Sequence, residues 1–172
     1  MIGRPEENEA AKFHWNYINL VQGNDAAAAL LDQLTQFDDL LGDLSEEQSF
    51  YRYAPGKWSI RESMGHVTDT ERIFAGRALW FARELGDSLP GFDQDVAVGS
   101  AEADRVRLVD HLEEFRQVRQ ATLTLFRNLP EAAWLRSGTA SGKRITVRAV
   151  AWVMAGHVEH HLRLFRERYL VG

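Results

Sequence analysis

Four long stretches of the sequence repeat apolar residues at intervals of three and four, the spacing that gathers them on one face of an α-helix. These stretches predict helices over residues 25–45, 59–85, 101–128 and 146–169. No segment shows a convincing strand pattern, and no internal repeat or linker divides the chain. Amphipathic helices bury their apolar faces against one another, so the pattern predicts an all-α four-helix bundle in which residues 1–172 form one domain.

Capping residues support three of the predicted helix starts. Asp25 and Thr146 are side chains that accept a backbone hydrogen bond in the first turn of a helix. Ser59 and Glu62 have the spacing of a capping box, in which each side chain bonds the backbone of the other residue.

The connecting segments contain the turn-forming residues. Residues 1–22 have no firm period and predict an irregular or short helical lead-in. The stretch SLPGFDQDVAVGS, residues 88–100, is longer than two adjacent antiparallel helices need, so we expect a loop that crosses one end of the molecule. Pro130 and SGTASGKR, residues 137–144, predict the turn before the last helix.

Composition excludes several classes of function. Hydrophobic residues make up 45% of the chain, and no apolar run approaches the roughly 20 residues of a membrane span, which predicts a soluble protein with no membrane partner. The start, MIGRPEENEAAKF, lacks an export signal and predicts a cytoplasmic location. The net charge of -5 and the absence of a basic patch argue against nucleic acid as a partner. Without cysteine, any metal ion has to be held by nitrogen and oxygen.

Three histidines fall within AGHVEHHLRLF, residues 155–165. His157 and His161 continue the inward register of the last helix, where they differ by about 40 degrees and bring their Cβ atoms about 5 to 6 Å apart. Two imidazoles so placed reach one ion at about 2.1 Å. His160 lies about 100 degrees from His161 and does not easily turn to the same ion. The alternative is an inert core pair, which would need a separate partner for each buried ring.

A third ligand is expected from another helix, and His66 is the candidate because it lies at the edge of the apolar stripe of residues 59–85. His111 falls on the polar side of its helix, beside Arg107 and Glu114, and is predicted to be solvated. His14 belongs to the lead-in and has no evident role.

Carboxylates near these histidines are candidates for a catalytic or supporting part, although most such groups are simply exposed. Asp69 and Glu71 follow His66, and Glu159 lies beside the histidine pair. Asp93 and Asp95, in GFDQD, are expected to be solvated or to cap a helix. They would matter if that loop folds over the open side of the metal.

With these residues identified, the chain resembles the DinB/YfiT-like superfamily of metal-binding four-helix-bundle proteins. The resemblance rests on YRYAPGKWSIRESMGHVTDTE, on PGFDQD and on AGHVEHHLRLF, and covers nearly all of the chain after the lead-in. It implies that His66, His157 and His161 are the metal ligands, in agreement with the helical register. It also implies an up-down-down-up bundle with a long crossover loop, and frequently a homodimer. The longer lead-in departs from the family pattern and is interpreted as a dimer arm or a lid.

Three neutral imidazoles leave a divalent ion at least one open position, as in a catalytic site. Zinc and nickel are favoured, and iron or manganese also suit imidazole. Family members include transferases and isomerases that use low-molecular-weight thiols, proteins named metal-dependent hydrolases, and many without assigned activity. We therefore expect a metal-dependent transferase or hydrolase acting on a small molecule, with Glu71, Asp69, Glu159 and His160 as the available bases or anchors. The alternatives are a stress-response protein that binds a metal or ligand without turnover, and a metal-free interaction protein.

Overall fold

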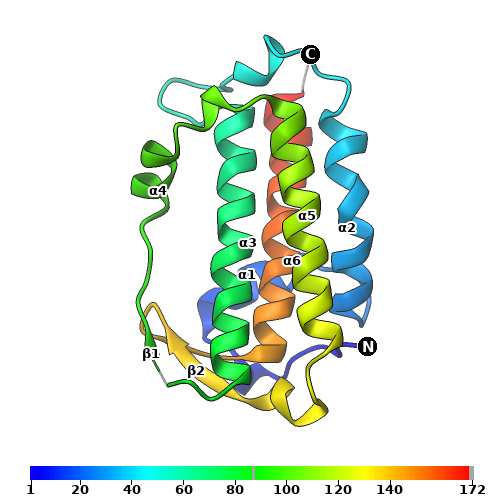
Figure 1. The fold of residues 1–172 in the computed structure, drawn as a ribbon, viewed down its shortest axis with the longest axis vertical. Helices are drawn as coiled ribbons and strands as arrows, with labels where there is room; N and C mark the ends of the chain where they lie inside the picture. The colour runs from blue at the N-terminus through cyan, green and yellow to red at the C-terminus, as the bar shows by residue number, and fades with distance from the viewer. Residues whose placement is uncertain (87, 171–172) are drawn as a thin grey trace.

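The four expected helices are present in the computed structural model, which describes residues 1–86 and 88–170 (Figure 1). They are α2 (Ala26–Leu41), α3 (Ile60–Ala82), α5 (Leu108–Arg127) and α6 (Val147–Leu164), and one π-helical turn, Phe165–Tyr169, continues α6. In Figure 1 α2 runs up, α3 and α5 run down, and α6 runs up. The up-down-down-up bundle is therefore confirmed. No helix in the described ranges is long and apolar enough to cross a membrane.

The predicted helix caps are formed. The Asp25 carboxylate accepts from the amide of Ala27, and the Thr146 hydroxyl accepts from the amide of Ala149. At the start of α3 both hydrogen bonds of the capping box between Ser59 and Glu62 are present. These bonds satisfy amides that a helix N-terminus otherwise leaves without a partner, which explains why the helices begin where they do.

The expectation that the segment between α3 and α5 crosses one end of the molecule is wrong, because this crossover runs along the length of the bundle (Figure 1). It contains strand β1 (Ser88–Leu89) and helix α4 (Gln94–Ala101), which stands outside α3 in Figure 1. Helix α4 forms because the Asp93 carboxylate accepts from two amides of its first turn. It ends at Glu102, whose left-handed φ of 48° breaks the helix, so α5 begins seven residues later than predicted. Val109, an apolar residue in the first turn of α5, is 52% exposed.

The expectation that the chain forms no strands is wrong for SGTASGKR. Strands β2 (Ser137–Ala140) and β3 (Lys143–Thr146) pair antiparallel, and β1 adds to β2 in parallel. Ser141 and Gly142 both have positive φ, as the tight turn of a two-residue hairpin requires. The strands were not predicted because four residues are too few to establish an alternating pattern.

The lead-in packs on α6 of its own chain. It contains two short 3-10 helices, Glu7–Glu9 and Lys12–His14, and helix α1 (Trp15–Ile18). The buried indole of Trp152 donates to the carbonyl oxygens of residues 2 and 3. Gly156 allows α1 to approach closely, because a Cβ there would lie 2.1 Å from the carbonyl oxygen of Tyr17. The lead-in is therefore part of the folded domain.

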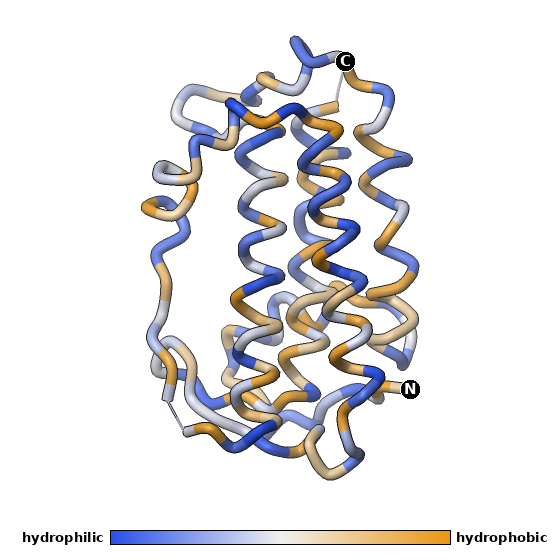
Figure 2. Tube along the Cα trace, viewed as in Figure 1, coloured by the Kyte–Doolittle hydropathy of each residue, from blue (hydrophilic) through white to orange (hydrophobic). Residues whose placement is uncertain are grey.

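A polar layer separates two apolar clusters of the described core, one around Trp152 and one around Phe37. Arg119 of α5 is fully buried and donates to both carboxylate oxygens of Glu71 on α3, at 2.7 and 3.0 Å. It also donates to the side-chain oxygen of Gln33 on α2. The colours of Figure 2 alternate along the same helices, as expected of elements with one polar and one apolar face.

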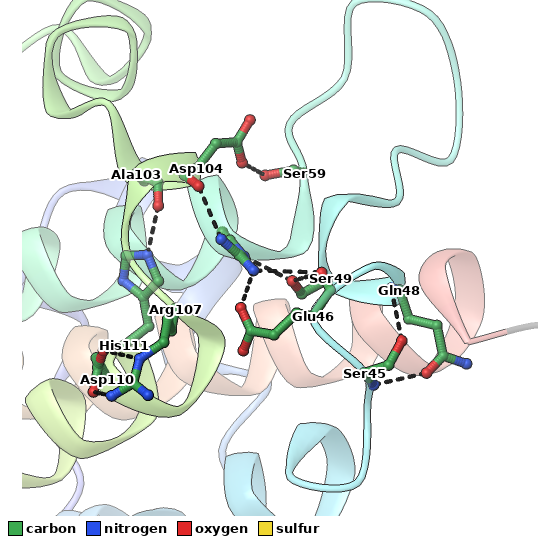
Figure 3. A network of polar contacts seen from close by, with 11 residues as sticks. Ser45, Glu46, Gln48, Ser49, Ser59, Ala103, Asp104, Arg107, Asp110 and His111 are labelled. Atoms are coloured by element: carbon green, nitrogen blue, oxygen red, sulfur yellow. Dashed lines mark hydrogen bonds and ion pairs between the residues drawn. The ribbon is translucent and has the colours of Figure 1, made fainter.

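The prediction that His111 is solvated is wrong. Its ring is 3% exposed, and its Nε2 donates to the carbonyl oxygen of Ala103 at 2.9 Å (Figure 3). The crossover covers this face of α5 and is fixed to the start of α3 through Asp104. The carboxylate of Asp104 accepts from the hydroxyl of Ser59 at 2.6 Å (Figure 3), and its carbonyl accepts from Arg61.

Candidate metal centre

Three histidines from two helices converge inside the bundle. His66 comes from α3, and His157 and His161 come from α6 one turn apart. All three side chains are buried, and one nitrogen of each lies within 4.8 Å of those of the other two. The ring centroids of His157 and His161 are 4.6 Å apart, and each lies 5.1 Å from that of His66.

The donor set fits a divalent metal ion. The Nε2 atoms of His66 and His157 are 3.1 Å apart. That separation lies within the roughly 3.0 to 3.4 Å expected between two nitrogens that each lie about 2.1 Å from one octahedral or tetrahedral ion. Nδ1 of His161 is buried and has no hydrogen-bond partner among the described residues, so one ring nitrogen of the cluster lacks any other interaction. A hydrogen bond between the two Nε2 atoms would involve only His66 and His157. An ion shared by all three rings would also account for the position of His161.

Burial keeps these imidazoles neutral. Burial first, and then the neighbouring His160, lower the pKa of His66 to about 4. The pKa values of His157 and His161 are well below 6.5, first because of burial and then because of repulsion between the clustered rings. At neutral pH the three rings therefore offer lone pairs, the form that binds a metal ion.

A pocket of about 640 Å³ opens beside the three histidines, and we call it the central pocket. The indole of Trp58 lies against His66, with ring centroids 4.8 Å apart, and Tyr17 lies 5.7 Å from the ring of His157. The crossover reaches this pocket through Gln94 and Asp95. The remaining lining residues are Tyr53, Gly56, Lys57, His160, Leu164 and Tyr169.

The comparisons with known proteins agree with this fold. The sequence model of the DinB superfamily matches residues 29–165. The chain belongs to the DinB superfamily. YfiT from Bacillus subtilis, described as a probable metal-dependent hydrolase with an unusual four-helix bundle topology, is similar in structure with a TM-score of 0.70 and 15% sequence identity. The match covers 94% of this chain and 91% of that chain. No curated protein matches the sequence.

His160 of this DinB superfamily member lies at the pocket and outside the three-histidine cluster. Its exposed ring is 5.2 Å from that of His161 and 6.0 Å from that of Tyr17. Its pKa is lowered, first by partial burial and then by the positive charge of Arg163. The histidine is therefore in reach of a ligand that binds beside the cluster.

The two carboxylates predicted as catalytic groups lie elsewhere. Both oxygens of Glu71 accept hydrogen bonds from Arg119, and the half-buried Asp69 pairs with Arg72. Neither residue is among those that line the central pocket. Glu159 accepts from the side chain of Gln33. The pocket geometry thus favours His160 over these acids as the group that meets a ligand.

Several residues at the DinB centre were not singled out from the sequence. Trp58 lies within the quoted APGKWS motif, so the signal was present. Tyr17 reaches the pocket only because the lead-in packs against Gly156, a tertiary contact with no periodic sequence signal. Asp93 and Asp95 were expected to matter if their loop reaches the space beside the histidines. It does reach this space, because Asp95 lines the central pocket.

Proposed function

We propose that this protein is a metal-dependent enzyme that acts on a small molecule at the three-histidine centre. The observation that carries the proposal is the convergence of three buried imidazoles beside an open pocket. A structural metal site is normally closed by a fourth protein ligand, whereas a three-ligand site leaves a coordination position for a substrate. The donor set within the described residues is of the second kind.

Two reactions are consistent with such a centre. When bound, the ion supplies a Lewis acid that lowers the pKa of a water molecule or of a substrate thiol. Attack by water would make the protein a hydrolase, and this route is supported by the description of YfiT as a probable metal-dependent hydrolase. Attack by a low-molecular-weight thiol would make it a transferase. Zinc or nickel is the ion we expect, with iron or manganese as further choices.

The residues around the pocket have separate roles in this proposal. His66, His157 and His161 hold the ion. His160, neutral at pH 7 because its pKa is lowered, accepts a proton from the attacking water or thiol. Trp58 packs on the ring of His66 and limits the entry of water. Glu71 does not touch the ligand and instead positions α3 against α5 through Arg119.

The alternative function is binding without turnover, as in a stress-response protein that holds a metal or a small ligand. One observation favours it, namely that Glu71 and Asp69 do not line the central pocket. We favour the enzyme because His160 does line it. We also propose that the protein is cytoplasmic and, from the family resemblance, a homodimer. Light scattering of the purified protein tests the homodimer.

Elemental analysis of purified variants tests the metal centre. His66→Ala, His157→Ala and His161→Ala are each expected to lose stoichiometric metal, because each removes one of three ligands. His160→Ala is the matched control, since it removes a histidine from the same helix turn without removing a ligand. It is expected to retain most of the metal. Equal metal content in all four variants, or none in the wild-type protein, would contradict the proposed centre.

Turnover assays separate the two reactions. The metal-loaded protein is incubated with a chloronitrobenzene and several cellular thiols, and separately with small esters and amides. Metal-dependent consumption of one thiol supports the transferase, and metal-dependent hydrolysis supports the hydrolase. His160→Ala is expected to lower the rate by about 100-fold or more while its metal content stays unchanged, the effect typical of losing a general acid or base. A metal-loaded protein that turns over neither class would support the binding function.

A further inference from the structure

A second pocket, of about 430 Å³, adjoins the central pocket, and we call it the side pocket. Tyr17, His66, Gln94 and His157 line both pockets, so the two meet at the three-histidine cluster. A small molecule in the side pocket therefore lies next to two of the proposed metal ligands. The walls come from the lead-in, α3, the crossover, the β2–β3 hairpin and α6.

A buried arginine faces this pocket with no carboxylate partner in the part of the chain that the structure describes. Arg77 is 7% exposed and donates to the carbonyl oxygen of Pro90 and to the hydroxyl of Ser141, both at 3.2 Å. Neither acceptor carries a charge, and the described residues give Arg77 no ion pair. Burial lowers the pKa of Arg77, the direction expected of a cation removed from water without a counter-ion. Such a buried charge is costly unless an anion completes the site.

Other polar groups in the side pocket also have no ion pair or hydrogen bond with a described residue. Lys143, from the hairpin, has no ion pair among the described residues, and its amine lies 5.4 Å from the ring centroid of Phe13. Nδ1 of His14 and the hydroxyl of Thr70 are buried and form no hydrogen bond with any described residue. Both residues line the side pocket. Buried polar atoms are nearly always satisfied, so these two point to a polar group that enters this space.

The charge and shape of the walls define the class of ligand. Arg77 and Lys143 carry two positive charges, and the exposed Asp93, whose Oδ1 caps α4, carries one negative charge. The balance suits a single negative charge and is less suited to a doubly charged phosphate. The Arg77 guanidinium lies 5.3 Å from the ring centroid of Phe74 and 5.8 Å from that of Phe92, so apolar surface surrounds the cationic group.

We propose that the side pocket binds a small aromatic or aliphatic carboxylic acid, whose carboxylate is anchored by Arg77 and Lys143 and whose apolar body lies against Phe13, Phe74 and Phe92. The site would hold the substrate of the proposed enzyme with its reactive group toward His66 and His157. Only this last statement depends on the proposed function. Binding of the acid itself depends on the side pocket alone.

Calorimetric titration with phenylacetate tests the proposal, with phenyl phosphate and the neutral 2-phenylethanol as comparison ligands. We expect phenylacetate to bind the wild-type protein more tightly than either. Arg77→Gln should weaken phenylacetate binding by about tenfold or more, because a charge-assisted hydrogen bond is lost. Arg77→Lys should recover part of the affinity. The metal content of both variants should equal that of the wild-type protein.

Two further variants separate binding from stability. The Lys143 side chain has no hydrogen bond or ion pair with any described residue and lies near the ring of Phe13. Lys143→Gln should therefore weaken phenylacetate binding in a protein that unfolds like the wild type. Lys57→Gln removes an exposed lysine of the central pocket and is the matched control, with unchanged phenylacetate binding expected. Affinity for 2-phenylethanol should be the same in all variants.

Three results would overturn the proposal. The first is no phenylacetate binding to the wild-type protein up to about 10 mM, well above the millimolar affinities of weak specific ligands. The second is equal affinity in wild type and Arg77→Gln. The third is binding that disappears when a chelator removes the metal, because the acid would then be a ligand of the ion. Phenylacetate binding that is unchanged in the metal-free protein supports the side pocket. This result would stand even if elemental analysis found no metal in the purified protein and so contradicted the proposed function.

Discussion

Arg119 and Glu71 form an ion pair at the level of the bundle where an apolar layer would otherwise continue. Both side chains are buried, and the fork of the guanidinium meets both carboxylate oxygens. Removing one partner of such a pair leaves an uncompensated charge inside the protein. The ion pair therefore stabilises the packing of α3 against α5 only when both Arg119 and Glu71 are present.

Arg119→Met is expected to lower the free energy of unfolding by about 3 to 5 kcal/mol, measured by urea denaturation. The double variant Glu71→Gln, Arg119→Met should lose less than Arg119→Met alone, because the orphaned charge is gone. Arg72→Met is the control: Arg72 pairs with Asp69 and Glu114 at the surface, where an ion pair contributes about 1 kcal/mol or less. A double variant no more stable than the single one would show that the charge itself is not the cause.

His14 predicts a dependence of stability on pH. Burial first, and then the positive charges of Lys143 and Arg77, lower its pKa from 6.5 to about 4. Between these values the unfolded chain binds a proton that the folded chain does not, so the free energy of unfolding falls as the pH falls from about 6.5 and levels off below about 4.

Urea unfolding of the metal-free protein at pH 7 and pH 5 measures this effect. His14→Gln should reduce the loss of stability between the two pH values by about 2 kcal/mol. The buried histidines of the cluster act in the same direction, so a slope remains in the variant. Parallel pH profiles for variant and wild type would mean that His14 titrates alike in both states.

The spacing of residues in the sequence was informative only where the position of a side chain depends on its own helix. His157 and His161 share a face because they are four residues apart, which the sequence states directly. His111 was predicted to lie on the polar side of its helix, yet it is buried, and so is Arg119 on the same helix. The crossover covers His111, and Glu71 forms an ion pair with Arg119. Neither contact can be predicted from the periodicity of one helix.

Gly156 determines how closely the lead-in can approach α6. A Cβ at this position would overlap the backbone of Tyr17, so Gly156→Ala is expected to cost about 1 to 3 kcal/mol in the free energy of unfolding and to disturb the pocket wall that Tyr17 forms. Gly76→Ala, in the middle of α3, is the matched control. A Cβ there meets nothing within 4 Å, and the same substitution should stabilise by up to about 1 kcal/mol. Thermal unfolding of both variants should therefore give shifts of opposite sign, and a shift of the same sign would argue against close packing of α1.

Among the helices and strands, the long helices were predictable from the sequence and the short elements were not. The periodic stripes and caps located α2, α3 and α6 to within a few residues. Helix α4 depends on one cap at Asp93, and the hairpin depends on positive φ at Ser141 and Gly142. Each of these features depends on one or two residues, so the sequence contains no repeating pattern that would predict it.

The whole molecule should be stabilised by the proposed ion, because its ligands lie 91 residues apart on α3 and α6. An ion that binds only the folded chain raises the free energy of unfolding by about 2.7 kcal/mol at a hundred times its dissociation constant. Thermal unfolding with and without added zinc should show the gain for wild type and for His160→Ala. His66→Ala should show none, and a gain of the same size in that variant would place the ion elsewhere.

The parallel orientation of α3 and α5 requires the chain to return along the length of the bundle, and this return forms walls of both pockets through Phe92, Asp93, Gln94 and Asp95. These four side chains are exposed and lie outside the two apolar clusters that hold the helices together. Replacement of Phe92, Gln94 or Asp95 would change which molecules are accepted at little cost to folding, whereas Asp93 is also needed as the cap of α4. A scaffold of this topology can therefore diversify its chemistry while its helices stay the same.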